Sequence, residues 1–167
     1  MSRRLVLIVI FLIIVGLSYF TYRFLVSNFQ QKSVNVVETE KAAEVSQVRH
    51  LVENFGKKLQ VVSLQSPDVS REIQKEYSKF VSPALLKVWT NDPSKAPGRI
   101  VSSPWPDRIE ITSLTKEEGE KYVINGYVIE ITSVEVVNGG AVAKIPVHIV
   151  VQKEQGHWVI TEYSENQ

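Results

Sequence analysis

The chain has 167 residues, no cysteine, and 19 basic side chains against 18 acidic ones. This length suffices for one domain of ordinary size. The near-neutral charge leaves no basic footprint for nucleic acid, and the lack of cysteine excludes a disulfide framework and thiol chemistry.

An uncharged apolar run, Leu5–Phe20, directly follows Arg3 and Arg4. The apolar character continues to Val26 and is broken only by Arg23, whose long side chain can extend into the headgroup layer. The extended run reaches the roughly 20 residues that a helix needs to cross a bilayer core. We therefore predict a transmembrane helix and, through it, membrane lipid as a partner.

A removable secretory signal is the alternative interpretation of the same run. The run is longer than the roughly 7–15 residues of a signal-peptide core, and no A-x-A cleavage site follows it. Gly16 and Ser18 supply the nearest cleavage context. We favour an uncleaved anchor in the cell membrane, single-pass, with a cytoplasmic N terminus and an extracytoplasmic C-terminal domain, because the basic residues precede the run. Cleavage would make the domain a secreted one.

The predicted organisation has three parts: residues 1–26 as cytoplasmic tip and transmembrane helix, 27–39 as a stalk, and 40–167 as a globular domain. The stalk is polar and lacks strong periodicity. As a flexible coil it would span roughly 20 Å. Its valines also suit a short strand or a continuation of the following helix.

From Glu40 onward, apolar residues recur at alternating spacings of three and four, which predicts one buried face of a helix. We call this face the apolar seam. It also suits a coiled-coil contact between copies, but it lasts for fewer than three heptads, so packing on the protein's own sheet is favoured. Its members are Val45, Val48, Val52, Phe55, Leu59 and Val62.

Two Ser-Pro pairs, Ser66-Pro67 and Ser82-Pro83, predict the starts of two shorter helices. Serine can cap the free N–H groups, and proline suits the first helical position. The predicted inward side chains are Val69, Ile73, Tyr77, Leu85, Leu86 and Trp89.

Residues 92–106 hold four of the seven prolines and predict a loop. Trp105 stands between two of these prolines, so we expect it outside helices and central strands. It would pack as a lid over the core, or alternatively line a ligand mouth or a partner surface.

After Asp107, the residues favour β-structure. Gly126 indicates a bulge or bend, and Asn138-Gly139-Gly140 a hairpin turn. Pro146 and His148 share the outer face of one strand, which indicates an edge or a bulge. The predicted strands are Arg108–Leu114, Tyr122–Val137, Ala141–Gln152 and His157–Tyr163. The whole predicts an α+β fold in which helices pack on a curved, cone-like antiparallel sheet of about four strands.

The stretch Gly156-His157-Trp158-Val159-Ile160 resembles the G-x-W-x-I final strand of nuclear-transport-factor-2-like (cystatin-like, cone-shaped α+β) domains. The order of elements from Glu40 to Tyr163 is similar as well. The resemblance implies an exported domain behind an anchor, like bacterial envelope proteins of unassigned function or the periplasmic scaffold subunit of type IV secretion systems. Enzymes of this superfamily place Asp, Tyr or His inside the cone, and no such constellation maps onto this chain.

Few side chains point to chemistry. The histidines at 50, 148 and 157 lack metal-ligand spacing, and Glu117-Glu118-Gly119-Glu120 suits a solvated turn better than a calcium loop. Asp107 beside Trp105 could act as a general base, but a strand-start aspartate paired with Arg108 is the simpler interpretation. The sequence therefore predicts no catalytic residue, no metal ligand and no cofactor, and it leaves the ligand-binding residues unknown.

The leading hypothesis is a single-pass, membrane-anchored extracytoplasmic domain that binds a protein partner or a small ligand without catalysis. The first alternative is a self-associating envelope scaffold resembling a type IV secretion subunit. The second is a pocket acid/base enzyme of the same superfamily. A cavity with at least two convergent ionisable side chains would favour the enzyme, and concentration-dependent dimers would favour the scaffold.

Overall fold

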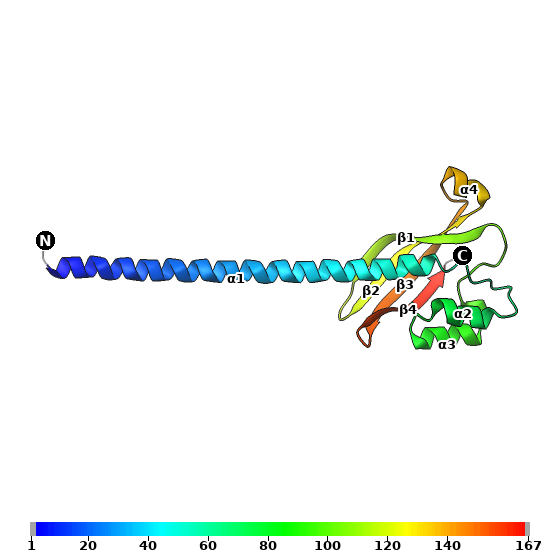
Figure 1. The fold of residues 1–167 in the computed structure, drawn as a ribbon, viewed down its shortest axis with the longest axis horizontal. Helices are drawn as coiled ribbons and strands as arrows, with labels where there is room; N and C mark the ends of the chain where they lie inside the picture. Colours follow the sequence, from blue (N-terminus) through cyan, green and yellow to red (C-terminus); the bar gives the residue numbers. More distant parts are fainter. Residues whose placement is uncertain (1–2, 166–167) are drawn as a thin grey trace. The chain divides into compact units, whose positions relative to one another are not determined.

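This computed structural model describes the backbone of residues 3–165 and the side chains of residues 17–24 and 38–165. The chain divides into two compact units, Met1–Glu44 and Val45–Gln167. The helical elements are α1 (Arg3–Gly56), α2 (Val69–Tyr77), α3 (Pro83–Asn91), the 3-10 turn η1 (Pro93–Lys95) and α4 (Ser133–Asn138) (Figure 1). The strands are β1 (Trp105–Lys116), β2 (Lys121–Ile131), β3 (Ala143–Glu154) and β4 (His157–Glu165).

The first unit is helical from Arg3 onward as part of α1. A coil over residues 27–39 is therefore wrong, and the alternative that this segment continues the following helix is correct. The physical reason is that the segment contains neither proline nor glycine to end a helix. Among the described residues, no helix includes an apolar stretch long enough to cross a bilayer, while the side chains of residues 3–16, which form most of the predicted span, lie outside the described ones.

The apolar seam is buried in the second unit, as predicted. Five of its six members have no exposed surface, and Val45 is half-buried. The helix itself ends at Gly56, where an added Cβ would lie 2.6 Å from the backbone nitrogen of Ile109. Tight turns then bring Leu59 and Val62 to the core. Because the seam is used within one copy, it leaves no free coiled-coil surface.

The start of α3 confirms the prediction, whereas α2 begins two residues later than expected. Ser82 caps α3 by accepting a hydrogen bond from the Leu85 N–H at 3.2 Å. Ser66 instead donates its hydroxyl to Glu72 at 2.7 Å and accepts from the Asp68 N–H at 3.2 Å, so the first helical residue is Val69. The inward side chains of both helices are buried or half-buried as predicted.

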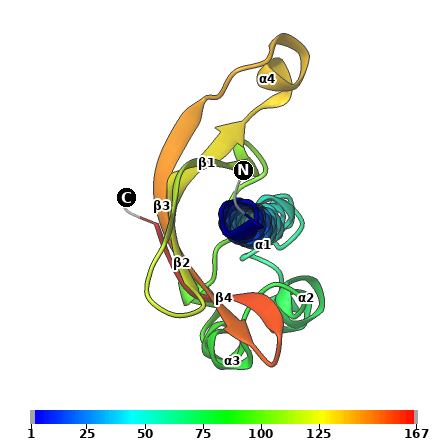
Figure 2. The ribbon, with the colours of Figure 1, turned by 90° about the vertical axis from the view of Figure 1, so that its left-hand side faces the viewer.

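The four strands form one antiparallel sheet in the order β1-β2-β3-β4. Figure 2 shows this sheet curving around the C-terminal part of α1, with α2 and α3 near β4. We call the face packed against α1 the inner face. Gly126 pairs with Ile111 next to a register shift, and an added Cβ would lie 2.3 Å from the Glu110 carbonyl oxygen. The α+β fold and the curved four-stranded sheet are thus as predicted.

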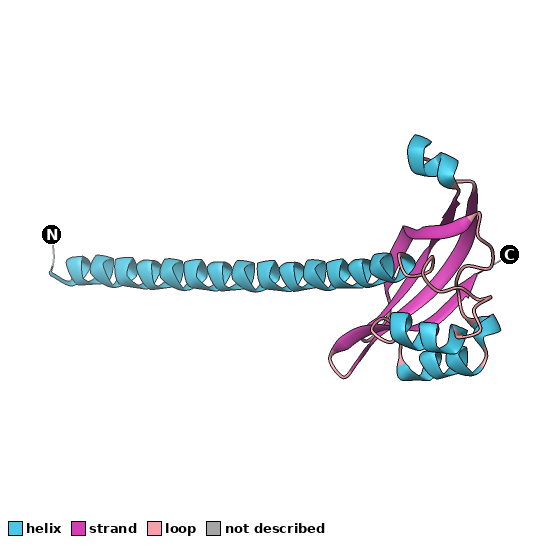
Figure 3. Cartoon of the chain, turned by 45° about the vertical axis from the view of Figure 1, so that its right-hand side comes forward, coloured by secondary structure: helices cyan, strands magenta, loops and turns pink. Residues whose placement is uncertain are grey.

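The predicted strand Tyr122–Val137 is wrong after Ile131, because Thr132 begins the short helix α4. The Thr132 N–H donates to the Glu135 carboxylate at 2.8 Å, and the Val134 N–H donates to the Thr132 hydroxyl at 3.2 Å. This capping box outweighs the β-propensity of the valines. Gly139, with φ 75°, then caps α4, so Asn138-Gly139-Gly140 ends a helix and does not join two strands directly (Figure 3).

The strand that contains Pro146 and His148 is central, so the prediction of an edge or a bulge holds only locally, as an edge at Pro146. His148 lies between Asn125 of β2 and Ser164 of β4. Pro146 pairs with Tyr127 of β2 and lies beyond Val147, the last β3 residue paired with β4. The missing proline N–H is therefore tolerated where β3 has one neighbour in the described sheet.

We predict that Gly126→Ala lowers the free energy of unfolding by about 1–3 kcal/mol, because the new methyl group overlaps the Glu110 carbonyl oxygen and the bulge must shift. Urea denaturation of the purified protein measures this change. Thr115→Ala, at an exposed position on β1, is the matched control and should change stability by less than about 0.5 kcal/mol. Equal stability of the Gly126 variant and the parent protein would contradict the close approach.

Candidate functional site

A bulge in the middle of β4 turns two polar side chains of its C-terminal half toward the inner face of the sheet. Trp158 and Ile160 are buried there. The register shifts between Val150 and Val151, which leaves Thr161 as the extra residue of β4. After this bulge, Tyr163 and Glu165 point inward, and Glu162 and Ser164 point outward. The β3 partners of the four inward residues, in order, are Lys153, Val151, Ile149 and Val147.

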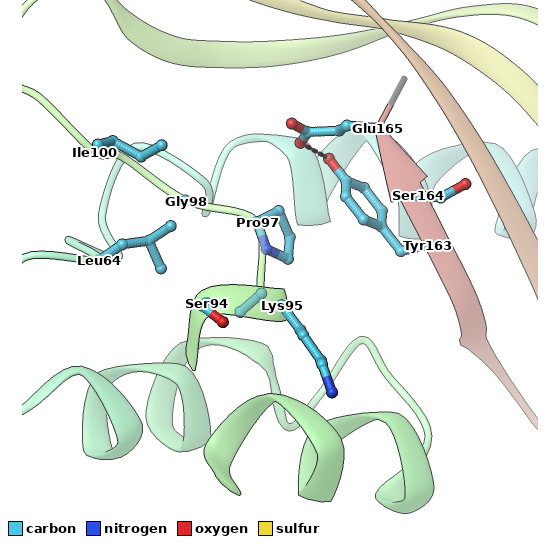
Figure 4. Close-up of a pocket in the computed structure, with 10 residues that line it drawn as sticks. Leu64, Ser94, Lys95, Pro97, Gly98, Ile100, Tyr163, Ser164 and Glu165 are labelled. Atoms are coloured by element: carbon cyan, nitrogen blue, oxygen red, sulfur yellow. Dashed lines mark hydrogen bonds between the residues drawn. The ribbon is translucent and has the colours of Figure 1, made fainter. Parts of the chain in front are cut away.

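A partly open cavity of about 220 Å³ lies between this strand end and the loop that follows η1 (Figure 4). Its lining comes from Tyr163–Glu165, from residues 94–98, and from Leu64 and Ile100. The volume is below the roughly 300–1,000 Å³ of pockets that enclose drug-sized molecules. The cavity therefore suits a small group or the end of a larger molecule.

Backbone pairing and one buried phenol hold the loop wall of this cavity. The Leu64 N–H donates to the Arg99 carbonyl and the Arg99 N–H donates to the Val62 carbonyl, both at 2.9 Å. The Tyr77 hydroxyl donates to the Pro97 carbonyl at 2.8 Å. Gly98 fits closely, since an added Cβ would lie 2.9 Å from the Val62 carbonyl oxygen. Burial raises the pKa of Tyr77 far above its ordinary value, so this phenol stays protonated and remains a hydrogen-bond donor to the loop.

The carboxyl of Glu165 accepts a hydrogen bond from the Tyr163 hydroxyl, as the dashed line in Figure 4 marks. Burial raises the pKa of Glu165; the bond from Tyr163 opposes this effect, and the charge of Glu130 adds to it. Burial also raises the pKa of Tyr163, and the neighbouring Glu165 charge adds to that shift. Both groups are therefore held toward their neutral forms.

Glu165 forms no ion pair with a cationic side chain of the described residues. Lys95 belongs to the cavity lining, but its ammonium pairs with Asp92 at 3.3 Å and points away from Glu165 in Figure 4. Glu76 and Glu110 contrast with Glu165. Their pKa values are lowered, chiefly by hydrogen bonds from Lys58 and Arg108 respectively. The site thus contains a half-buried carboxyl whose hydrogen-bond donor is a neutral phenol.

The residues singled out in the sequence lie away from this cavity. The Arg108 guanidinium contacts Asp107 and also Glu110, each at 2.6 Å, which confirms the simpler interpretation of Asp107. Trp105 is half-buried at the start of the edge strand β1. In the acidic turn between β1 and β2, Glu117 pairs with Lys121 at 2.9 Å and Glu120 pairs with Lys153 at 2.8 Å.

Two of the three histidines, His50 and His157, line one open surface pocket, whereas His148 is not part of it. His50 approaches Glu53 at 3.5 Å, His148 contacts Asn125 at 2.9 Å, and His157 is exposed beside the last turn. Within the described part of the chain, no group of three or more His, Cys, Asp or Glu side chains is placed to hold a metal ion.

Sequence reasoning missed Tyr163 and Glu165 as site residues. Strict alternation from Trp158 and Ile160 would place Glu162 and Ser164 on the inner face and would send Tyr163 and Glu165 outward. Only the extra residue at Thr161 reverses this parity. The one available signal was the Tyr-x-Glu pair of Tyr163 and Glu165 at the end of the last strand.

A second surface feature lies on α4 and on the segment that follows it, within the connection from β2 to β3 (Figure 3). It consists of four exposed valines, which we call the α4 valine patch. Their exposed fractions are 58% for Val134, 63% for Val136, 83% for Val137 and 51% for Val142. Neighbouring exposed apolar side chains of this kind are typical of contact surfaces.

No protein-family model matches this chain. No curated protein matches it either. Among solved structures, it is similar to the intermembrane-space region of the chloroplast protein ARC6, with 18% identity over 67% of this chain and 91% of that one and a TM-score of 0.38. It is also similar to the NTF2-like engineered protein Rd1NTF2_05, with 16% identity over 66% of this chain and 91% of that one and a TM-score of 0.32. Likenesses this distant carry no argument about function.

We predict that Glu165→Gln removes a pH dependence of stability. Because burial raises the pKa of Glu165 in the folded protein, its contribution is fully present below the unfolded pKa and is lost as pH rises through the folded pKa. The stability of the variant relative to the parent protein should therefore increase as the pH rises from about 4 to 7.

Urea denaturation at several pH values measures this difference. Glu162→Gln, at an exposed position on the same strand, is the matched control. If both variants follow the same pH dependence relative to the parent protein, burial of Glu165 has no influence on folding.

Proposed function

We propose that this chain is a single-pass membrane protein whose extracytoplasmic domain, of the nuclear-transport-factor-2-like kind, binds a protein partner or a small ligand without catalysis. The observation that carries the proposal is the cavity at the end of β4, where a half-buried carboxyl lacks a cationic partner in the described chain. Such a group is costly to keep inside a fold unless something uses it.

Membrane anchoring is supported by the apolar run behind two arginines and by the described side chains within it. Five large apolar or aromatic side chains between residues 17 and 24 are 59–70% exposed. Exposure of so many large side chains on one short helical segment is favourable in lipid and unfavourable in water. They are Leu17, Tyr19, Phe20, Tyr22 and Phe24.

Binding without catalysis is supported by how the interior is filled. The Phe55 and Trp89 rings stack with centroids 6.2 Å apart, and Tyr77 meets Phe55 edge-on at 5.1 Å. Tyr163 closes this cluster, with centroid distances of 5.7 Å to Phe55 and 6.0 Å to Trp89. The interior space in which enzymes of the resembled superfamily hold reactive groups is thus occupied by the protein's own rings, which supports recognition at the cavity without catalysis.

Two other functions each have an observation in their favour. A self-associating scaffold is favoured by the α4 valine patch, which a second copy could cover. An acid/base enzyme is favoured by Glu165, because burial moves the pKa of its carboxyl toward the neutral range in which a general base is effective. In that second case, however, Tyr163 and Glu165 are hydrogen-bonded to each other and come from one strand, and the third ionisable side chain of the lining, Lys95, pairs with Asp92.

We predict that a reporter enzyme fused after Gln167 is active if it is of the kind that works only after export, and inactive if it is of the kind that works only in the cytoplasm. Alkaline phosphatase tests for export in bacterial cells, and β-galactosidase tests for cytoplasmic exposure. Exchange of Arg3 and Arg4 for glutamate is the control, because it removes the basic residues that set the orientation and should reduce the phosphatase signal. Activity of the cytoplasmic reporter alone would contradict an extracytoplasmic domain.

We also predict that a photoreactive benzoylphenylalanine in place of Ile100, an exposed residue of the cavity lining, forms a discrete adduct in native membranes. The same substitution at Thr115, which is exposed on β1 and outside the lining, is the matched control and should give none. Electrophoresis with mass spectrometry detects the adduct. Identical adducts from both positions, or none from position 100, would contradict binding at this cavity.

A further inference from the structure

We propose that the β4 cavity binds a cationic amine, with the ammonium group seated against the carboxylate of Glu165 and beside the ring of Tyr163. This inference rests on the proposed binding function and adds the chemical class of the ligand.

The carboxyl of Glu165 keeps unused acceptor capacity at the cavity. An ionised carboxylate offers about four lone-pair positions, and the Tyr163 hydroxyl occupies one of them. The described chain supplies no ion pair to this carboxyl, although it supplies them to Glu76, Asp92 and Glu110. An ammonium group, with three N–H donors and one positive charge, matches what is missing.

The nearby charges favour a cation over an anion. Glu130 of β2 acts on Glu165 with a like charge. The Lys95 ammonium forms an ion pair with Asp92 at 3.3 Å, and the Lys144 ammonium forms one with Glu110 at 3.5 Å. In the part of the chain that the structure describes, the other titratable groups that interact with Glu165 are the phenols of Tyr77 on α2 and Tyr163 on β4, which burial holds in their neutral form. The local charge is therefore negative whenever Glu165 is ionised.

The size of the cavity selects among amines. A volume of about 220 Å³ admits a short alkylammonium ion or the end of a lysine side chain, but not a drug-sized base. Tyr163 adds an aromatic ring to the lining, and such rings attract cations. The partly open shape allows either source: a free small amine, or an amine that projects from a protein partner.

Binding of a cation should favour the ionised form of Glu165 and so release a proton. Affinity is therefore expected to increase as the pH rises through the pKa of Glu165, which burial raises. A neutral ligand that accepts a hydrogen bond from the protonated carboxyl would show the opposite pH dependence. This difference in sign distinguishes the two modes.

The test uses the full-length protein in detergent micelles and isothermal calorimetry. The probes are butylammonium chloride, Nα-acetyl-lysine methylamide and neutral 1-butanol, all at constant ionic strength. We expect both amines to bind at pH 7.5 and at least tenfold more weakly at pH 4, with 1-butanol at least tenfold weaker than butylammonium. Glu165→Gln should weaken both amines at least tenfold, whereas Glu162→Gln should leave them unchanged.

The two amine probes separate the sources, because tighter binding of the lysine derivative identifies a protein side chain and tighter binding of butylammonium identifies a free amine. Equal affinity in the parent protein and Glu165→Gln, equal affinity for 1-butanol, or tighter binding at pH 4 would each overturn the proposal. If the benzoylphenylalanine at position 100 forms an adduct in native membranes but neither amine binds, the ligand class is wrong and the binding function stands. Absence of both would overturn the binding function as well.

Discussion

The extra residue at Thr161 is the constraint on which the site depends. It reverses the side-chain parity of β4, so that Tyr163 and Glu165 continue the inner face begun by Trp158 and Ile160. Burial of the carboxyl follows from this reversal, and the raised pKa of Glu165 follows from the burial. A regular strand would have presented Glu162 and Ser164 inward and left Glu165 in solvent.

The helices determine how much of the inner face remains available. The apolar seam at the end of α1 and the rings of Phe55, Tyr77 and Trp89 fill the space under the sheet. The hydrogen bond from Tyr77 to the Pro97 carbonyl then fixes the loop opposite Glu165. A filled interior beside a small polar cavity supports recognition of a group at the surface of the domain, which is the basis of the proposed binding function.

Most of the architecture follows from local patterns, but the site does not. Spacings of three and four predict the buried seam, Ser82-Pro83 predicts the start of α3, and Gly126 marks the bulge in the pairing of β1 with β2. The helix α4 escaped prediction because the Thr132 capping box competes with the β-propensity of the valines. The cavity escaped it because one bulge reverses the parity of β4, and because its loop wall lies far from β4 in the sequence.

The most direct measurement is the titration of the Glu165 carboxyl carbon by ¹³C NMR, with Glu165→Gln used to assign its resonance. We predict that this carboxyl ionises above the ordinary range of a glutamate, since burial raises its pKa and only a neutral phenol bonds to it. Addition of butylammonium should lower that pKa. Ionisation of Glu165 within the ordinary range of a glutamate, unchanged by the amine, would contradict a buried carboxyl that can bind a cationic partner.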